Sequence, residues 1–195
     1  VIKPLSESAL CLFKENFKRT AKEFTMDWKL NELAKPVKAL ILVSKTDHCL
    51  NDILYRTRTN HLNINITAVV SNHETNRELV EQRNIDFHYL PVSKDTKSVQ
   101  EKQIRDLIYK TGSELIIMAR YMQILSNQFC EDYAGRIINI HHSFLPGFKG
   151  AKPYHQAYER GVKIIGATAH FATPDLDEGP IIEQNIVRID HSYPP

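Results

Sequence analysis

The sequence predicts an α/β fold whose mainly parallel sheet ends in an antiparallel hairpin. Between residues 39 and 140, short apolar runs typical of buried strands alternate with helical segments. This order implies right-handed βαβ crossovers and a sheet covered on both faces. After residue 164, two strand-like segments follow one another with only a turn-rich loop between them. We therefore expect these two segments to pair antiparallel and extend a Rossmann-like sheet.

The expected elements are bounded by the apolar pattern and its breaks. The parallel strands cover residues 39–43, 64–70, 87–90, 115–119 and 136–140. The helices between them cover residues 50–59, 75–83, 97–109 and 127–133. Ser126 is placed to cap the last of these helices. The hairpin joins residues 164–172 to residues 181–189.

A separate amphipathic helix is expected before the sheet. Apolar residues recur at helical spacing from Leu5 to Phe24, which favours one helix over that range. Pro36 then marks a boundary, because proline neither continues a helix nor donates a backbone hydrogen bond. The alternation of strands and helices begins directly after it.

Composition and charge exclude several classes of function. The 195 residues are 42% hydrophobic and 25% charged, with a formal net charge of +2. This balance gives no reason to expect nucleic acid or an anionic membrane as a partner. No apolar run reaches the roughly 18 residues of a transmembrane helix. Cys11, Cys49 and Cys130 fit neither a metal site nor a disulfide framework, so we expect free thiols in the reducing cytoplasm.

Nucleotide cofactors and metals are not expected either. The first strand is followed by Ser44–His48, which contains no glycine, whereas a dinucleotide-binding turn needs glycines to approach the pyrophosphate. The nine histidines are scattered. His141 and His142 are sequence neighbours and should point apart, so they are poor joint ligands for one ion.

Three polar segments follow strands that should end at the same edge of the sheet. They are Arg120–Leu125, Asn139–Gly147 and the hairpin loop that ends in Asp177–Gly179. Ligands and catalytic groups are carried at this edge in α/β sheets. Each residue alone also has an ordinary reading, as a turn amide, a surface histidine or a turn acid. Their combination indicates a site without naming a reaction.

Three motifs resemble those of the folate-dependent formyltransferase family. They are Asn139–Pro146, Gly166–Phe171 and Asp175–Ile182, in the family's order. The resemblance spans about Lys38 to Ile189. It implies the formyltransferase fold and three catalytic residues: Asn139, His141 and Asp177.

Four further stretches resemble the branch of the family that hydrolyses 10-formyltetrahydrofolate. They cover residues 43–54, 68–73, 118–126 and 141–151. Glycinamide ribonucleotide transformylases have a glycine- and serine-rich phosphate loop after the first strand, where this chain has Ser44–His48 with an acid and no glycine. The departure favours water as the acceptor. The implied products are formate, for purine synthesis, and tetrahydrofolate, which balances the one-carbon pool.

Two alternative functions stay open at this point. One is formyl transfer from 10-formyltetrahydrofolate to an amine acceptor such as glycinamide ribonucleotide. The other is a non-catalytic folate-binding module, which would keep the pterin-binding segment Tyr121–Leu125 and lose one of the three catalytic residues.

The resemblance also implies a role for each site residue. Asn139 and His141 donate hydrogen bonds to the developing oxyanion. Asp177 orients and deprotonates the attacking water or holds His141 protonated. Gln123 stands where the transformylases have an arginine, so one cationic contact on the folate side is lost or replaced. The expected substrate-binding residues are Tyr121, Met122, Gln123, Ile124, Leu125, His170, Ala172, Thr173, Pro174 and Asp175.

The resemblance finally implies a domain organisation and a set of partners. Residues 1–36 are expected to form a linker helix that follows a missing N-terminal ACT domain. Residues 37–195 are expected to form the catalytic domain, truncated at its C-terminus. The folate is the substrate, and neither a metal nor a redox cofactor is expected. A homo-oligomer formed partly by regions outside this chain is a further expectation.

Overall fold

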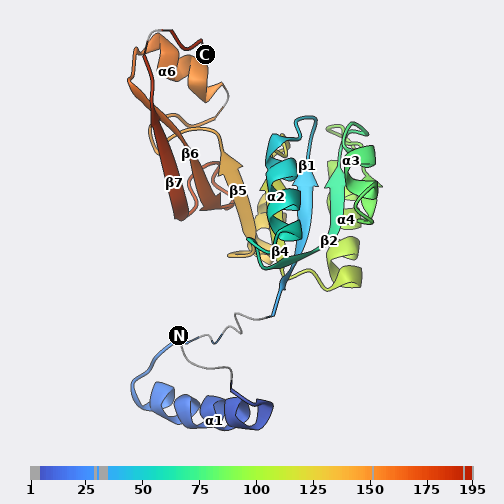
Figure 1. Ribbon diagram of the computed structural model, residues 1–195, viewed down its shortest axis with the longest axis vertical. Helices are drawn as coiled ribbons and strands as arrows, with labels where there is room; N and C mark the ends of the chain where they lie inside the picture. The colour runs from blue at the N-terminus through green and yellow to red at the C-terminus, as the bar shows by residue number, and fades with distance from the viewer. Residues whose placement is uncertain (1–4, 29, 31–34, 151, 191, 195) are drawn as a thin grey trace. The chain divides into compact units, whose positions relative to one another are not determined.

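A computed structural model describes residues 5–28, 30, 35–150, 152–190 and 192–194. The chain divides into two units, residues 1–35 and residues 36–195, which are described separately (Figure 1).

The described residues of the first unit contain one helix. α1 (Glu7–Glu23) starts after Ser6, whose side chain accepts a hydrogen bond from the Ala9 amide. The helix predicted over residues 5–24 is confirmed. Phe17 stacks on Phe13 and packs edge-on against Trp28. That this helix is a linker after another domain stays a prediction.

The second unit is built on a seven-stranded sheet, in the order β3-β2-β1-β4-β5-β6-β7. Its first five strands pair in parallel, and β6 and β7 add two antiparallel pairs. The predicted fold class is thereby confirmed (Figure 1). The strands are β1 (Val37–Val43), β2 (Ile64–Ser71), β3 (Phe87–Tyr89), β4 (Leu115–Ala119), β5 (Ile137–His141), β6 (Ile164–Phe171) and β7 (Ile181–Arg188).

Four of the five helices of this unit were predicted, and one was missed. The predicted ones are α2 (His48–Arg58), α3 (Arg77–Glu81), α4 (Lys97–Thr111) and α5 (Asn127–Asp132). Ser126 caps α5 by accepting from the Phe129 amide, as expected. The missed helix is α6 (Pro153–Glu159). Its seven residues are too few to show an apolar stripe, and its start depends on Pro153 at the first helical position.

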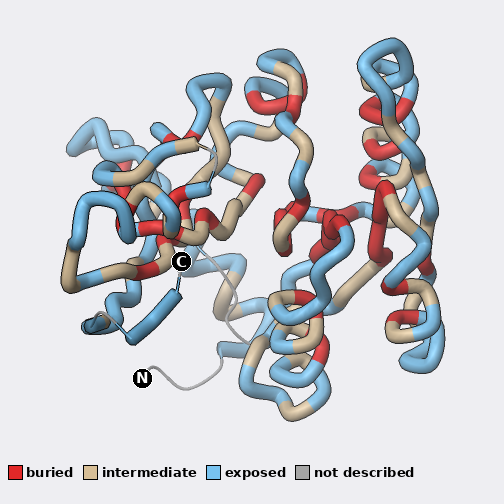
Figure 2. Tube along the Cα trace, turned by 90° about the horizontal axis from the view of Figure 1, so that it is seen from above, coloured by how far each residue is buried: buried red, intermediate tan, exposed pale blue. Residues whose placement is uncertain are grey.

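The two faces of the sheet bury separate apolar clusters. Along β1, Leu40 and Leu42 face α4 and α5, whereas Ile41 and Val43 face α2 and α3. Side chains alternate between the two faces of a strand, so one continuous apolar run supplies both cores. Figure 2 shows buried segments along the central strands and on the inward sides of the helices.

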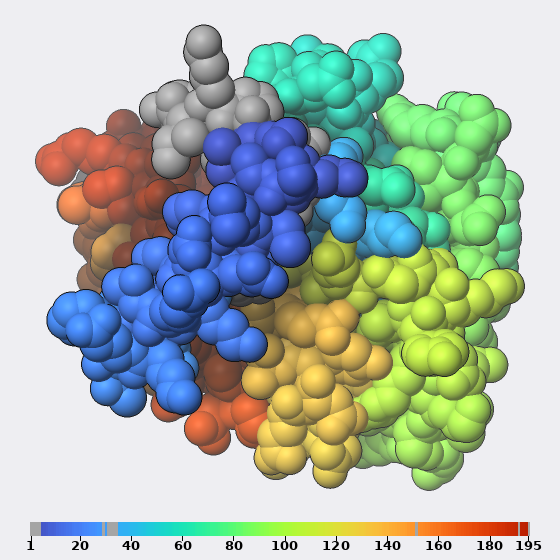
Figure 3. Space-filling view, turned by 90° about the horizontal axis from the view of Figure 1, so that it is seen from below, coloured from blue at the N-terminus to red at the C-terminus, as the bar shows by residue number. Residues whose placement is uncertain are grey.

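The parallel strands place their carboxyl ends at one edge of the sheet. In the strand register, Val43 lies beside Ala119 and Met118 lies beside Asn139. The segments that follow β1, β4 and β5 therefore leave the sheet at nearly the same level. Figure 3 shows the molecule from the opposite side, where the end of α4 (yellow-green) adjoins the residues before β5 (gold).

Candidate active site

Four polar side chains from β5, β6 and the loop between β6 and β7 meet at this edge. Asn139 and His170 are paired across β5 and β6, and Asn139 Nδ2 lies 3.1 Å from His170 Nε2. Asp177 Oδ1 lies 3.4 Å from His141 Nδ1 and 3.8 Å from His170 Nε2. The three residues predicted as catalytic are therefore brought together, with His170 between the amide and the carboxylate. Asn139 and His141 belong to the last part of β5 itself and not to the loop after it.

The hydrogen-bond partners define how each ring is protonated. His141 Nε2 lies 2.9 Å from the Phe148 carbonyl oxygen, so Nε2 carries a hydrogen and Nδ1 faces the carboxylate. An imidazolium satisfies both partners. His170 Nδ1 lies 2.9 Å from the Phe171 carbonyl, so its Nε2 is free to accept from the Asn139 amide. His141 Nε2 can donate a hydrogen bond to a bound formyl oxygen only after its hydrogen bond to the Phe148 carbonyl oxygen is broken.

Asp177 is held in place by its backbone and by the loop after β5. Its side chain is buried, with only 8% of the residue exposed. Its φ of +57° lies in the left-handed region, which aspartate and asparagine tolerate better than most residues. Oδ2 accepts a hydrogen bond from the Gly150 amide at 3.1 Å, which leaves Oδ1 facing the two imidazoles. A buried, oriented carboxylate beside histidines is a suitable general base.

A narrow pocket opens beside Asn139, His170 and Asp177. Six other predicted substrate-binding residues line it, from the β4–α5 segment and the β6–β7 loop: Gln123, Ile124, Leu125, Ala172, Thr173 and Pro174. The lining also includes three residues that the sequence reasoning did not single out: Met118, Cys130 and Leu176. Met118 is the second-last residue of β4, Cys130 lies in the helix that Ser126 caps, and Leu176 lies between two acids. Each of these positions could have suggested the residue.

Four predicted site residues do not line this pocket. His141 lies behind Asp177, and Met122 is 60% exposed. Tyr121 is buried in the core and donates its hydroxyl hydrogen to Gln100 Oε1 at 3.0 Å. Burial raises the pKa of Tyr121 to about 12, so the phenol stays neutral. Contact of Tyr121, Met122 and Asp175 with a folate stays a prediction.

Buried hydrogen bonds hold the β4–α5 segment against its neighbours. Ser44 Oγ accepts from the Met122 amide at 3.0 Å and donates to Asn72 Oδ1 at 2.8 Å. Glu101 accepts from both the amide and the hydroxyl of Ser126. The segment is thus fixed at both ends, which preorganises this wall of the pocket before any ligand arrives.

His142 is a neutral neighbour of the site. Its ring lies 5.6 Å from the rings of both His141 and Tyr154. Burial, with the charge of Arg120 second, lowers the pKa of His142 from 6.5 to about 4. The unfolded chain therefore binds more protons than the folded protein between these two values, and stability is lost as the pH falls through this window.

Replacing His142 by glutamine is expected to reduce the loss of stability that occurs as the pH falls. The variant removes the group whose protonation differs between the two states. Urea midpoints of both proteins at pH 7 and pH 5 measure the effect. His155→Gln is the matched control, because His155 is exposed on α6. Equal midpoint shifts in wild type and His142→Gln would contradict the assignment.

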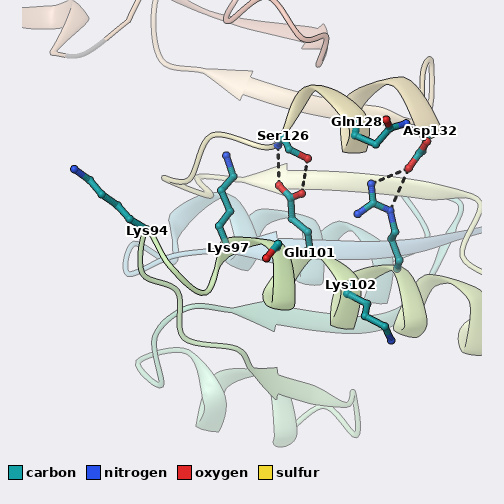
Figure 4. Close-up of a pocket in the computed structure, with 9 residues that line it drawn as sticks. Lys94, Lys97, Glu101, Lys102, Ser126, Gln128 and Asp132 are labelled. Carbon is teal, nitrogen blue, oxygen red and sulfur yellow. Dashed lines mark hydrogen bonds and ion pairs between the residues drawn. The ribbon is translucent and has the colours of Figure 1, made fainter.

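Another hollow of the described surface lies elsewhere. It has a volume of about 740 Å³ and lies between α4 and α5, with Lys94, Lys97, Lys102 and Arg105 on its walls (Figure 4). Its acids are already engaged: Asp132 pairs with Arg105 at 2.7 Å, and Glu101 holds Ser126. The narrower pocket is the candidate site, because a carboxylate, imidazoles and an amide converge beside it.

The described residues contain neither a membrane-spanning helix nor a metal-binding cluster. No helix among them has the length and apolar character needed to cross a membrane. No group of three or more His, Cys, Asp or Glu side chains within those ranges is arranged to hold a metal ion.

Known proteins are similar to this chain in sequence and in fold. A family model described as formyl transferase matches residues 37–194. The formyltetrahydrofolate deformylase of Corynebacterium sp. (strain P-1) is 53% identical over 182 residues, which are 93% of this chain and 64% of that protein. A crystal structure of the Pseudomonas syringae formyltetrahydrofolate deformylase has a TM-score of 0.91 and 43% identity, and covers 98% of this chain and 63% of that one.

A transferase structure is similar as well. Phosphoribosylglycinamide formyltransferase from Anaplasma phagocytophilum has a TM-score of 0.75 and 30% identity, over 82% of this chain and 76% of that one. The chain spans less than two thirds of the two deformylases. The match over most of residues 37–195 confirms the family resemblance found in the motifs. This chain belongs to the formyl transferase family.

Proposed function

We propose that the protein hydrolyses 10-formyltetrahydrofolate to formate and tetrahydrofolate. The observation that carries the proposal is the convergence of Asn139, His141 and buried Asp177 beside a pocket. The names of the most similar relatives, deformylases at 43–53% identity, support the choice of reaction.

The site offers each group that the reaction needs. Asp177 takes a proton from the attacking water, whose oxygen adds to the formyl carbon. Asn139 donates to the oxyanion that forms, and an imidazolium at His141 stabilises the same charge. A single oxyanion donor typically contributes about 10²–10³ in rate. The bond from carbon to N10 then breaks as N10 takes the proton that Asp177 holds, and formic acid loses its proton to the solvent to become formate.

The narrow pocket is the proposed site of the pterin. Ile124 and Leu125 on one wall and the Ala172–Pro174 loop on the other give apolar faces and backbone groups for its hydrogen-bonding edge. We infer that the folate and water are the two reactants and that no redox cofactor is needed, because hydrolysis changes no oxidation state. The free thiols of Cys11, Cys49 and Cys130 support a cytoplasmic location. The formate would serve purine synthesis.

The rival reaction is transfer of the formyl group to an amine acceptor. The likeness to a phosphoribosylglycinamide formyltransferase supports it. Against it stands the segment after β1, Ser44–His48, which lacks the glycines that let backbone amides cradle a phosphate. Hydrolysis is therefore the better fit.

Release of formate without any acceptor is the expected result of a direct assay. The full-length protein is incubated with 10-formyltetrahydrofolate, with and without glycinamide ribonucleotide, and formate and formylated product are both measured. Equal formate release in the two samples supports hydrolysis. Formyl transfer that depends on the ribonucleotide would refute it, and binding without turnover would indicate a non-catalytic folate module.

A further inference from the structure

Arg120 occupies a central position at the carboxyl edge of the sheet. It directly follows β4, and its backbone oxygen accepts from the Ser44 amide at 3.3 Å. Since Val43 pairs with Ala119 and Met118 with Asn139, Arg120 lies level with Ser44 on one side and His141 on the other. Neighbouring parallel strands are about 4.8 Å apart, so Arg120 is next to the segments that follow β1 and β5.

The backbone of Arg120 is in an unfavourable conformation for its side chain. Its φ is +61°, in the left-handed region that costs free energy for a residue with a Cβ atom. Glycine would adopt this conformation without that cost. Such positions are concentrated at ligand-binding sites. The strained backbone therefore suggests that the arginine side chain has a function at this edge.

The guanidinium has no protein partner within the described parts of the chain. Its Nε is buried and makes no hydrogen bond, whereas Arg56, Arg77 and Arg105 each form an ion pair. A buried donor without an acceptor is costly, and it is explained when a bound anion supplies the acceptor. Arg136 shows the usual alternative, because it donates to the carbonyl oxygens of Glu114 and Ser113.

Arg120 acts on Cys49, which lies in the first turn of α2 and packs against the core cluster on the α2 and α3 face. Burial raises the pKa of Cys49, and the charge of Arg120 opposes that rise. The pterin pocket is lined instead by Met118, Leu125 and Cys130, which belong to the core cluster on the α4 and α5 face. The site at Asn139, His141 and Asp177 thus has an apolar side for the folate and a cationic side, which is where a charged product would leave.

We propose that Arg120 forms a subsite for the formate carboxylate, on the α2 side of the site. The inference rests on the proposed hydrolysis, which creates a carboxylate from a neutral formyl group. The planar guanidinium matches a carboxylate in a bidentate geometry. Because the apolar pocket occupies the α4 and α5 side, the side of Arg120 is left as the one from which water attacks and formate departs.

Formate binding is expected to weaken roughly 10- to 100-fold when Arg120 is neutralised, the range for a hydrogen-bonded ion. Binding of ¹³C-labelled formate to the resting full-length protein is followed by NMR line broadening, and formate inhibition of turnover is measured in parallel. The variants are Arg120→Gln and Arg120→Gly. Glycine adopts the left-handed conformation without strain, so a loss of formate binding in Arg120→Gly is not caused by backbone strain and unfolding. Arg120→Lys should restore part of the affinity.

Arg105→Gln is the matched control, because Arg105 lies in the groove between α4 and α5 and pairs with Asp132. It should bind formate as wild type does. Equal formate affinity in wild type and Arg120→Gln would overturn the subsite, as would inorganic phosphate binding more tightly than formate. A wild-type protein that binds formate through Arg120 but releases none from 10-formyltetrahydrofolate would instead refute the proposed function. The two failures are therefore distinguishable.

Discussion

Asp177→Asn is expected to lower the rate of formate release by about 10²–10⁴-fold, the contribution of a positioned acid or base. Asparagine keeps the size of the side chain and tolerates the left-handed backbone at this position, so the pocket should keep its shape. It cannot accept the proton from water or compensate an imidazolium at His141, 3.4 Å away. The measurement is kcat and KM for 10-formyltetrahydrofolate, with the loss expected in kcat.

Glu178→Gln is the control for this variant. Glu178 is the neighbouring acid, but it is exposed and pairs with Lys149 at 2.8 Å. Exposed pairs contribute little, so its kcat should stay close to that of wild type. A near-normal kcat in Asp177→Asn would remove Asp177 from the chemistry. A large rise in its KM with unchanged kcat would assign it to binding alone.

Gly179→Ala is expected to destabilise the protein by about 3 kcal/mol or more, at the upper end of overpacking effects. A Cβ atom at this position would lie 1.7 Å from the Phe171 carbonyl oxygen and 2.9 Å from its carbon. Both are backbone atoms at the end of β6, so the β6–β7 loop must move. Because this loop positions Asp177, activity should fall with stability. Chemical denaturation and the formate assay measure the two effects.

Gly161→Ala separates the clash from ordinary backbone strain. Gly161 has a φ of +64° and no atom within 4 Å of an added Cβ, so only the left-handed conformation is penalised, by about 1–2 kcal/mol. Its activity should be retained, because it lies between α6 and β6 and away from Asp177. If Gly179→Ala loses no more stability than this control, the close approach of Gly179 to Phe171 does not hold the loop.

The apolar pattern was sufficient for the order and type of most elements. Runs such as Ile116–Ala119 have to be buried on both faces, and burial on both faces of a strand requires parallel pairing with helices on either side. The two strands of the hairpin are close in sequence with no helix between them, which leaves antiparallel pairing as the simple solution. Helix α6 was not predicted, because a seven-residue helix is stabilised mainly by tertiary packing and is too short to show a clear apolar periodicity.

Residue types and their position after strands also identified the polar members of the site. Asn139, His141 and Asp177 were predicted from motifs and are brought together by the structure. Their roles stay a proposal. Tyr121 illustrates the limit of the same reasoning, because a residue beside a binding segment can turn into the core, where its hydroxyl bonds to Gln100.

The sequence by itself thus determined the family, the mixed sheet and the polar residues near its carboxyl edge. Only the tertiary structure decided which of them meet. Asp177 lies 36 residues after His141 in the sequence, and their contact depends on the register of β5 and β6 and on the backbone of one loop. The unpartnered guanidinium of Arg120 is likewise invisible in a sequence, because whether a donor is satisfied depends on every group that packs around it.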